Sequence, residues 1–424
     1  MGGDTQLKKH VEDELSWQPS VDEASIGVSV KDAIVTLPPD SATTPKSVAH
    51  RSSTAAAKKV AEILALAGIE IGGRRPWDLQ VYDERFYQRL LSDGSLASGE
   101  SYMDGWWDSE ALDQLCTRVH GANLTAKVGE WETIWLALKG RIFNRQTKSR
   151  SAKVAQEHYD LGNDIYGAML GQRMQYTCGY WKEATTLDQA QENKLGLICR
   201  KIQLEPGMTV LDLGGGFGGL AHFMASEYGC RVVSYNISAE QETYGREWCR
   251  GLPVRFEQKD YREAACEAEN FDRVVSIGLC EHIGLKNYPA FFDLAHRKLK
   301  SAGLFLLQSI GGNASYTCTD AWMDKYIFPN GMIPSVAQFG EAMEGRWVVE
   351  DWHNFGPDYD KTLMAWWQNF DRAWPAHQHK YGERFYRMWK YYLMGCAGGF
   401  RARKLQLWQI VLSKGDIPAY TSVR

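Results

Sequence analysis

The spacing of apolar residues is most regular in the middle of the chain. The apolar run 209–213 breaks into a glycine-rich stretch at 214–219, and a segment with helical spacing then leads into a second apolar run at 231–235. Strand, glycine turn, helix and strand make one βαβ unit of a parallel sheet. Later apolar runs alternate with helical segments in the same way, among them 271–277 and 304–308. The pattern therefore predicts an α/β fold with a parallel sheet, whose ligand lies at the carboxyl ends of the strands.

The segments around this βαβ pattern are predicted to form separate parts of the chain. Residues 4–37 have the pattern of a helix followed by two short strands, and residues 38–54 form a Pro/Ser/Thr-rich linker without periodicity. Residues 55–150 are predicted to form a helical N-terminal domain with one short β-like piece at 77–81. The sheet domain then occupies 151–424. Its C-terminal part, rich in Trp and Tyr, is predicted to add helices and two strands that complete a cavity.

One predicted helix of the N-terminal domain has a pattern that suits a lipid surface. Its apolar face would comprise Trp131, Ile134, Trp135, Leu138 and Ile142. Basic residues gather at and beyond its end, namely Lys139, Arg141, Arg145, Lys148, Arg150 and Lys153. An aromatic and aliphatic stripe with such a basic collar suits a helix lying on an anionic bilayer. The same pattern is also typical of a domain core with a solvated, charged end, so both interpretations stay open.

The composition of the 424 residues narrows the class of protein. A net charge of −4 gives no overall preference for nucleic acid. Nine cysteines without a CxxC spacing argue for a reducing compartment and against a disulfide framework or a zinc site. No apolar run reaches the length of a transmembrane helix, and the N-terminus lacks the apolar region of a signal peptide. We therefore expect a cytoplasmic protein that binds neither nucleic acid nor metal.

The glycine turn alone does not identify its ligand, because dinucleotide sites begin in much the same way. Asp212 ends the first strand, where it can orient the glycine loop or contact the cationic end of a ligand. A dinucleotide site would need an acid at the end of the second strand, but that position is Asn236 and no acid comes before Glu240. The motif D-x-G-G-G-x-G-G resembles motif I of class I S-adenosylmethionine-dependent methyltransferases. A turn without a ligand is the alternative.

Further motifs, in the same order along the chain, resemble those of the cyclopropane-fatty-acyl-phospholipid synthases, a family of class I methyltransferases. This resemblance runs from about residue 58 to the C-terminus. It rests on EHYDLGND (157–164), MQYTCGYW (174–181), ISAEQ (237–241), EHIGLKNY (281–288), KYIFPNG (325–331), DWHNFGPDYDKTLMAW (351–366) and CAGGFRAR (396–403). It implies an α/β fold of the class I methyltransferase, Rossmann-like type, with a helical N-terminal cap and insertions that line a lipid cavity.

The N-terminal segment carries a second, partial resemblance. Residues 1–37 are similar to the opening half of a BON module, a small domain linked with phospholipid surfaces. The second half of such a module is missing, because the linker 38–54 follows. A leader without a function of its own is the alternative interpretation.

The family resemblance implies a chemistry that fits these residue types. Family members add a methylene group from S-adenosylmethionine to the cis double bond of an acyl chain in a phospholipid. An isolated alkene is a poor nucleophile, so the sulfonium methyl must be held in line with it and water kept out. Aromatic faces can stabilise the resulting carbocation. Carried onto this sequence, the cofactor-binding residues are Tyr176, Thr177, Asp212, Gly214, Gly216, Asn236, Ile237, Gln241, Asp260, Tyr261, Ile277 and Gly278.

Ring closure requires a base, which in the family is a bound bicarbonate. Carried over, the residues that hold it are Cys178, Glu281, Gln308, Ile310 and Tyr359, with Cys178 and Ile310 acting largely through backbone N–H groups. Glu281 would accept the bicarbonate proton, and Tyr359 would donate to an oxygen. For His282 and Cys396 we expect structural roles, as a hydrogen-bonding and a packing residue.

Three positions depart from the family pattern. Gln308 stands where the family has His, and an amide still donates a hydrogen bond but carries no charge and relays no proton. Anion affinity is therefore expected to fall, and ring closure to slow or to change. Gly215 replaces a common Cys and Asn236 a usual Thr, and both changes are expected to matter little.

Three functions therefore remain open at this point. The leading one is cyclopropanation of phospholipid acyl chains, with S-adenosylmethionine and bicarbonate as cofactors. A second keeps the fold and the cofactor but gives a methylene- or methyl-branched chain. A third is a lipid-binding protein with lapsed catalysis. The expected partner is a phospholipid membrane surface with cis-unsaturated acyl chains, contacted peripherally at the inner membrane face. A homodimer stays open.

Overall fold

The computed structural model describes residues 29–31, 34–36, 54–124 and 163–424. Residues 1–52 and residues 53–424 form two separate compact units. In the first unit, β1 (Ser29–Lys31) and β2 (Ile34–Thr36) pair in antiparallel register, which agrees with the two short strands predicted there. The helix predicted before them, the linker, and the amphipathic segment that begins at Trp131 lie outside the described residues.

The second unit contains a seven-stranded sheet with the order β10-β11-β9-β8-β5-β6-β7 among its described residues. Six of these strands run in the same direction, and β11 is antiparallel to both of its neighbours, β9 and β10. The strands are β5 (Thr209–Leu213), β6 (Arg231–Asn236), β7 (Val254–Gln258), β8 (Phe271–Ile277), β9 (Leu299–Gly312), β10 (Val348–Asn354) and β11 (Leu405–Ser413). The predicted fold class is thereby confirmed, including both late strands.

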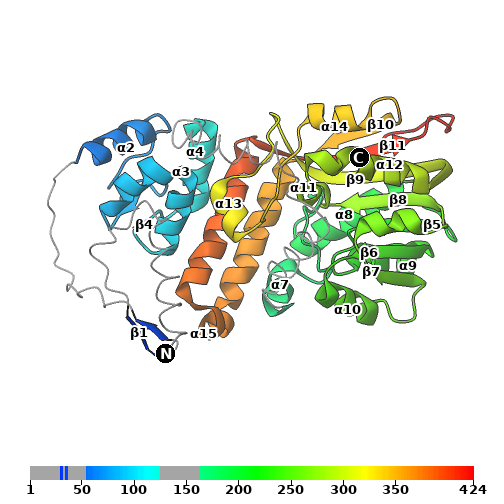
Figure 1. Ribbon diagram of the computed structural model, residues 1–424, viewed down its shortest axis with the longest axis horizontal. Helices are drawn as coiled ribbons and strands as arrows, with labels where there is room; N and C mark the ends of the chain where they lie inside the picture. The colour runs from blue at the N-terminus through cyan, green and yellow to red at the C-terminus, as the bar shows by residue number, and fades with distance from the viewer. Residues whose placement is uncertain (1–28, 32–33, 37–53, 125–162) are drawn as a thin grey trace. The chain divides into compact units, whose positions relative to one another are not determined.

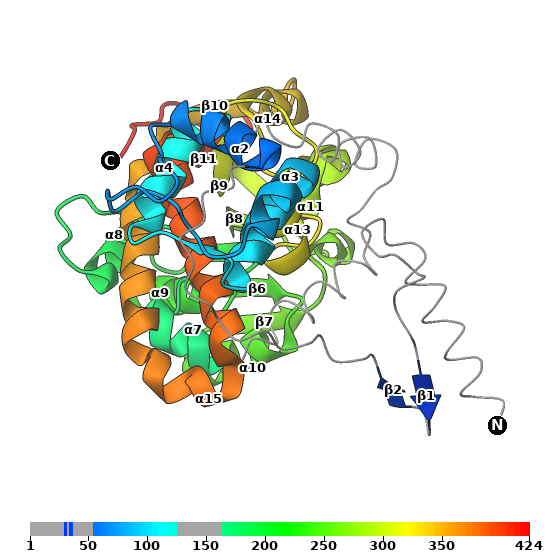
Figure 2. The same cartoon turned by 90° about the vertical axis from the view of Figure 1, so that its left-hand side faces the viewer.

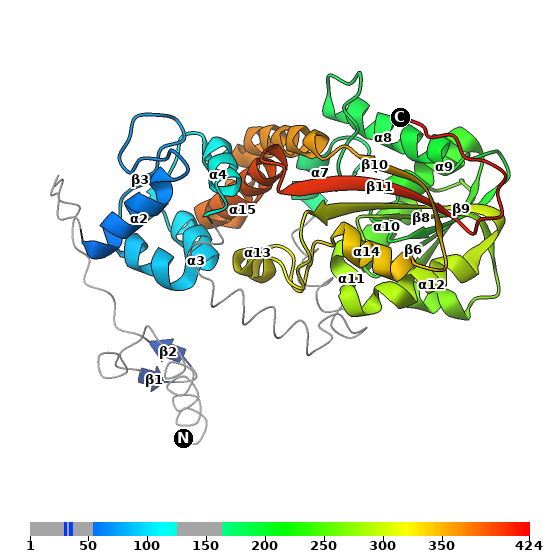
Figure 3. The ribbon, with the colours of Figure 1, turned by 90° about the horizontal axis from the view of Figure 1, so that it is seen from above.

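Helices cover both faces of this sheet, as Figure 3 shows. On one face, α8 (Leu187–Lys201) and α9 (Gly219–Tyr228) pack against Val210, Val232 and Leu306. On the other face pack η3 (Tyr261–Cys266), α12 (Tyr288–Lys298) and α14 (Val336–Met343). Every residue of β5 is buried, which explains why its sequence is an almost continuous apolar run.

Within residues 54–124, the part of it that the structure describes, the cap comprises three helices and a two-stranded sheet. They are α2 (Ala55–Ala65), β3 (Gln80–Val81), α3 (Arg85–Met103), β4 (Trp107–Asp108) and α4 (Leu112–Gly121). The short β-like piece predicted at 77–81 is thus a strand of two residues that pairs with β4. Helix α2 begins at Thr54, whose side chain accepts a hydrogen bond from the Ala57 N–H, and Gly68 turns the chain at its end with φ 64°.

A long helical element, α15 (Pro357–Arg401), lies between the cap and the sheet (Figures 1 and 2). It is broken at Gly382, where φ is 75° and ψ is 165°, so its two halves form a helical hairpin. Its aromatic side chains share one hydrophobic core with the cap helices and with α7 (Asn163–Leu170). The cap and the sheet are thereby parts of one compact unit.

The remaining elements connect the sheet to its helices. They are α10 (Ala239–Trp248), α11 (Cys280–Ile283), η4 (Leu285–Asn287) and α13 (Ala321–Tyr326). Among the described residues, no helix combines the length and the apolar character needed to cross a membrane.

Candidate active site

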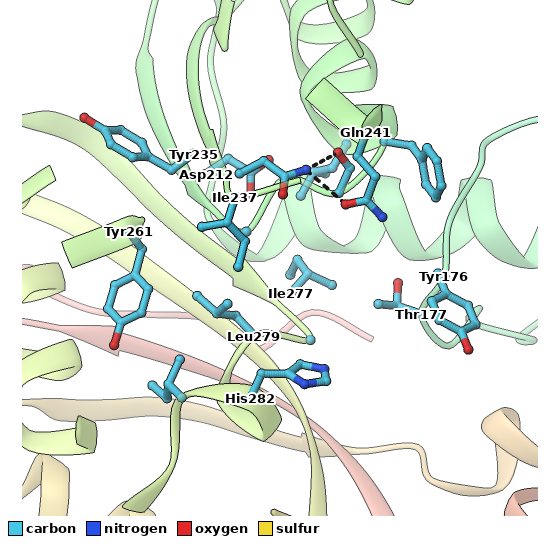
Figure 4. A pocket seen from close by; sticks show the side chains of 18 of the residues that line it. Tyr176, Thr177, Asp212, Tyr235, Ile237, Gln241, Tyr261, Ile277, Leu279 and His282 are labelled. Carbon is cyan, nitrogen blue, oxygen red and sulfur yellow. Dashed lines mark hydrogen bonds between the residues drawn. The ribbon is translucent and has the colours of Figure 1, made fainter. Parts of the chain in front are cut away.

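One pocket lies at the carboxyl ends of the parallel strands and is drawn in Figure 4. Such a position follows from the topology, because the loops after β5, β6, β7 and β8 meet at that edge of the sheet. All the residues that the sequence predicts as cofactor-binding line this pocket: Tyr176, Thr177, Asp212, Gly214, Gly216, Asn236, Ile237, Gln241, Asp260, Tyr261, Ile277 and Gly278. In Figure 4, Tyr176 and Thr177 lie at one end of it and Tyr261 at the other.

The glycine turn after β5 lines this pocket with main-chain atoms, because its glycines have no side chains. The N–H groups of Gly214 and Gly215 both donate to the Tyr235 carbonyl, at 3.0 and 3.1 Å, which ties the turn to β6. Gly214 has φ 92° and Gly216 has φ 54°, values that side chains rarely tolerate. Helix α9 begins directly after the turn, so its free N–H groups lie beside the pocket.

Gly215 has no room for a side chain, for a reason that the sequence did not reveal. A Cβ atom built on it would lie 1.8 Å from the Ser234 Oγ and 2.8 Å from the Asp212 Oδ2. Ser234 in turn donates a hydrogen bond to the Asp212 Oδ2 at 3.3 Å. The absence of a side chain at 215 is thus matched to the presence of a serine at 234.

The end of β6 forms a polar network beside the glycine turn. The Asn236 amide donates to the Gly216 carbonyl at 2.8 Å and to the Gln241 Oε1 at 3.0 Å. The Asn236 Oδ1 accepts a hydrogen bond from the Ser238 N–H at 3.0 Å. No acidic side chain stands at this strand end, where a dinucleotide site would hold the ribose hydroxyls.

A loop after α13 covers part of the pocket and was not assigned a role from the sequence. Phe328, Pro329 and Asn330 all line the pocket. The loop is fixed by the Asn330 N–H, which donates to the Asp324 Oδ1 at 2.8 Å, and by the Met332 N–H, which donates to the Glu281 carbonyl at 2.9 Å. The signal for it was present, since KYIFPNG is one of the motifs of the family resemblance.

Glu281 is buried beside this pocket on α11, with 8% of its surface exposed. Its Oε1 accepts a hydrogen bond from the Ile310 N–H at 2.6 Å, whereas its Oε2 is buried without a hydrogen-bond partner. Burial raises the pKa of Glu281 to about 7, against the opposing effect of the Ile310 N–H. A carboxylate with a raised pKa and a vacant acceptor atom is a candidate for proton transfer.

Tyr359 and Cys178 lie in the same neighbourhood as Glu281. Burial raises the pKa of Tyr359, and the nearby ionisable groups of Cys178 and Glu281 raise it further. The Tyr359 ring packs against Phe400, with ring centroids 4.6 Å apart, and against Trp366 at 5.9 Å. The Cys178 thiol donates to the Gly179 carbonyl at 3.1 Å, and burial raises its pKa, so this thiol is not set up as a nucleophile.

Gln308 has a partner that the sequence did not suggest. Its Oε1 accepts a hydrogen bond from the Gln409 Nε2 at 2.9 Å, across the register of β9 and β11. Gln308 does not line the pocket, but it lies two residues before Ile310 and therefore on the same face of β9. The structure thus brings Cys178, Glu281, Ile310 and Tyr359 together. Gln308 lies on β9, two residues before Ile310.

Two other residues have the surroundings of structural groups. His282 lines the pocket, packs edge to face against Phe328 at 5.4 Å, and has its pKa lowered to about 4 by burial. Burial raises the pKa of Cys396 to about 12. Neither group is therefore ionised near neutral pH.

The sheet order and the pocket together define a class of protein. The antiparallel strand β11 is inserted between β9 and β10, and a glycine turn after the central strand β5 opens a pocket at the carboxyl edge. This is the architecture of a class I S-adenosylmethionine-dependent methyltransferase.

Comparisons with known proteins place the chain within that class. The family model described as mycolic acid cyclopropane synthetase matches residues 146–410. The cyclopropane-fatty-acyl-phospholipid synthase of Escherichia coli strain K12 is 50% identical over 355 residues, which cover 84% of this chain and 92% of that protein. The chain therefore belongs to the cyclopropane synthetase family, and it is an S-adenosylmethionine-dependent methyltransferase.

Two further relatives show the range of the similarity. Sphingolipid C9-methyltransferase A of Emericella nidulans is 32% identical over 331 residues, which cover 74% of this chain and 64% of that protein. The solved structure of mycolic acid cyclopropane synthase CmaA1 complexed with SAH and CTAB is similar with a TM-score of 0.57 and 29% identity. That similarity covers 62% of this chain and 98% of the other.

Proposed function

We propose that the chain transfers a methylene group from S-adenosylmethionine to the cis double bond of an acyl chain in a phospholipid, and so forms a cyclopropane ring. The observation that carries this proposal is the buried carboxylate of Glu281, which lies beside the pocket with one oxygen atom free to accept a proton. Methyl transfer to an alkene leaves a carbocation, and closing a ring from that cation requires the loss of a proton to a base, so a buried proton acceptor at this place fits ring closure.

The pocket residues fit the donor from one end to the other. Tyr176 and Thr177 stand where its methionine part would lie, and Asp260 and Tyr261 flank the position of its adenine. Asn236 and Gln241 present polar groups for the ribose. When bound, S-adenosylmethionine supplies an electrophilic methyl group on a sulfonium.

Aromatic side chains surround the position where positive charge would develop. Tyr176 packs against Trp366, with ring centroids 5.3 Å apart, and its hydroxyl donates to the Tyr392 hydroxyl at 2.9 Å. Together with Tyr359 and Phe400, these rings offer electron-rich faces that stabilise a cation without reacting with it. Their bulk also excludes water, which would otherwise capture the cation.

Bicarbonate fits the residues next to Glu281. The orphan Oε2 of Glu281 needs a hydrogen-bond donor, and the O–H of this anion provides one. When bound there, bicarbonate supplies an oxygen base that removes the proton lost in ring closure. Glu281 would hold it by accepting that hydrogen bond, and Tyr359 would donate to a second oxygen.

The departure at Gln308 gives a test of this base site. In the Gln308→His variant, one imidazole nitrogen can keep the hydrogen bond of Gln409 and the other can donate to an anion. We expect half-maximal activity at a lower bicarbonate concentration than in the wild type, while Gln308→Leu should need more. An unchanged bicarbonate requirement in both variants would contradict the role given to position 308.

The function is tested by incubating the purified full chain with vesicles of a cis-unsaturated phospholipid and methyl-labelled S-adenosylmethionine. We expect label in the acyl chains and a mass increase of one methylene unit per modified chain, with a rate that rises when bicarbonate is added. Label that stays out of the lipid fraction would contradict the proposal.

A second candidate is a branched product on the same class of acyl chain. It is favoured by Gln308, which cannot relay a proton, and by the similarity to the relative named a sphingolipid C9-methyltransferase. Both products add one methylene unit, so mass does not distinguish them. Proton NMR does, because cyclopropane hydrogens resonate upfield of ordinary alkyl hydrogens.

The proposed partner is a phospholipid membrane surface, contacted peripherally from the cytoplasmic side. This follows from a substrate that resides in a bilayer. The net charge of −4 gives no overall attraction to an anionic surface, so the contact would depend on local basic residues. Flotation with vesicles tests it: the chain should rise with them and be released by high salt if basic residues make the contact.

A further inference from the structure

Helix α8 supports the segment that carries Tyr176 and Thr177 into the pocket. The Gln191 amide donates to the Thr177 carbonyl at 2.9 Å, and the Tyr180 N–H donates to the Ala190 carbonyl at 2.8 Å. Two adjacent residues of one helix therefore fix the backbone of this segment. No residue of α8 itself lines the pocket.

Lys194 continues this contact with a side chain that is fully buried. Its Nζ donates to the Gln175 Oε1 at 2.5 Å and to the Thr177 Oγ1 at 3.0 Å. Both acceptors belong to residues that line the pocket. A buried lysine is rare unless it is paired, and two neutral acceptors alone do not balance its charge.

The charge near Lys194 is the carboxylate of Asp212 on β5. Burial lowers the pKa of Lys194 to about 7 and raises the pKa of Asp212 to about 7, and each group opposes the shift of the other. The other ionisable group that acts on Lys194 is the thiol of Cys178. The Ser234 hydroxyl donates a hydrogen bond to Asp212 and, like Lys194, lowers the pKa of this carboxyl.

We propose that Lys194, although it does not line the pocket, is a positioning residue for the methyl donor. Its Nζ fixes the side chains of Gln175 and Thr177, two residues that line the pocket. This inference rests on S-adenosylmethionine as the ligand of the pocket. Lys194 touches neither the donor nor the acyl chain.

The arrangement couples donor binding to a proton. S-adenosylmethionine carries a positive charge on its sulfonium, which S-adenosylhomocysteine lacks. On the protein, the loss of a proton from either Lys194 or Asp212 makes the net charge of these two side chains more negative by one. A more negative pair favours the charged donor over the uncharged product. The preference for the donor should therefore rise with pH through about 7, where the pair titrates.

The test is calorimetric titration of the full chain with S-adenosylmethionine and with S-adenosylhomocysteine between pH 6 and pH 8.5. In Lys194→Met we expect about 10-fold weaker donor binding, because two hydrogen bonds from an ionised group are lost. The pH at which the donor preference rises should also move upward, because the ammonium that lowers the pKa of Asp212 is gone. A purely structural lysine would not move that pH.

Lys201 provides a matched control on the same helix. It is also fully buried, but its Nζ pairs with the Asp351 Oδ2 at 3.1 Å on β10 and touches no pocket residue. Lys201→Met should lower the melting temperature and leave donor affinity and its pH dependence unchanged. Equal donor affinity and an equal pH profile in Lys194→Met and the wild type would overturn the inference.

A measurement on the wild type alone covers the case in which Lys194→Met does not fold. Titrations near pH 7 in buffers of different ionisation enthalpy give the number of protons released on binding. We expect more protons released with the donor than with the product, and equal numbers would overturn the inference. If the wild type bound neither molecule, the proposed function itself would fail, which is a different outcome.

Discussion

At the scale of single residues, Glu281 is the group on which ring closure depends. Glu281→Gln keeps the shape and the Ile310 contact but removes the negative charge that accepts a proton. We expect kcat to fall by about 100- to 10,000-fold, the range of general acid–base effects, with donor affinity changed less than about twofold. Steady-state kinetics on vesicles and calorimetry measure the two quantities.

Glu350→Gln serves as the control for that variant. Glu350 is a partly buried carboxylate on β10 that accepts a hydrogen bond from the Ser413 hydroxyl at 2.5 Å, outside the pocket. The kcat of the Glu350→Gln variant should equal that of the wild type. A Glu281→Gln enzyme with a similar kcat would show that the proton leaves by another route.

The raised pKa of Glu281 also predicts opposite pH trends for activity and stability. Activity needs the ionised carboxylate, so it should rise with pH through about 7 and be lost below it. In the folded state the carboxyl holds its proton to higher pH than in the unfolded chain. Its contribution to stability is therefore fully present below 4.5, the ordinary pKa of a glutamate side chain, and lost as pH rises through about 7.

Thermal unfolding of the wild type and Glu281→Gln from pH 5 to pH 8 measures the second trend. The gap between the two melting temperatures should shift in favour of the variant as pH rises. A gap that does not change with pH would mean that burial does not perturb this carboxyl.

The close approach of Gly215 and Ser234 predicts that substitutions at these two positions have non-additive effects on donor affinity. Gly215→Ala alone should weaken donor binding by about 10-fold or more, because the new Cβ displaces the Ser234 hydroxyl and crowds Asp212 in a packed site. In Gly215→Ala with Ser234→Ala the nearest clash is gone, so part of the affinity should return. Calorimetry on the four proteins gives the coupling energy, and additive effects would contradict the close approach.

The sequence predicted the residues of the pocket better than those behind it. Asp212 and Asn236 lie at the carboxyl ends of β5 and β6, and Gly278 directly follows β8, and the topology of a parallel sheet alone brings such positions to one edge. Lys194 could not be found in this way. A lysine within a helical pattern is usually solvent-exposed, and Lys194 is buried only because α8 packs against the segment 174–181.

At the scale of elements, Glu100 connects the cap to the loop that covers the pocket. It lies on α3, largely buried, and forms ion pairs with Arg89 and with Lys325, the latter at 2.7 Å, while the Tyr326 hydroxyl donates to it at 2.8 Å. Lys325 and Tyr326 end α13, and Phe328 follows two residues after Tyr326. The cap thereby helps to position the Phe328–Asn330 loop.

Glu100→Ala should therefore affect both stability and donor binding. We expect a loss of about 2 to 4 kcal/mol in the free energy of unfolding, because two positive groups lose their partner, and a donor affinity weaker by several-fold. Denaturant unfolding and calorimetry measure them. Glu247→Ala, which breaks an exposed pair with Arg250, should cost about 0.5 kcal/mol or less. Equal losses in the two variants would contradict the link.

Some elements departed from their expected lengths for physical reasons. The run at 304–308 is the centre of the longer strand β9, because Leu299 at one end and Gly311 at the other pair with β8 and β11. Helix α15 continues through Pro375 and breaks instead at Gly382. Gly382 adopts a positive φ that other residues avoid, and nothing local in the sequence distinguishes it from the glycines within helices.

At the scale of the whole molecule, the arrangement separates two tasks. The sheet edge offers polar backbone and side chains to the donor, whereas α15 and the cap helices supply an aromatic core beside it. The alternation of strands and helices predicted the sheet edge that binds the donor, because the spacing of apolar residues and the glycine turns are local features of the sequence. The aromatic core beside it depends on helices far apart in sequence, so the Trp and Tyr content predicted only that a cavity is completed there, and the family resemblance implied that it holds lipid.

The most direct test of the whole account is the structure of the product. The full chain is incubated with cis-unsaturated phospholipid vesicles, bicarbonate and S-adenosylmethionine carrying a ¹³C-labelled methyl group, and the acyl chains are examined by NMR. The account predicts that the labelled carbon is a ring methylene whose two protons resonate upfield of all ordinary alkyl protons. A labelled methyl branch or exocyclic methylene, with no upfield signal, would contradict it.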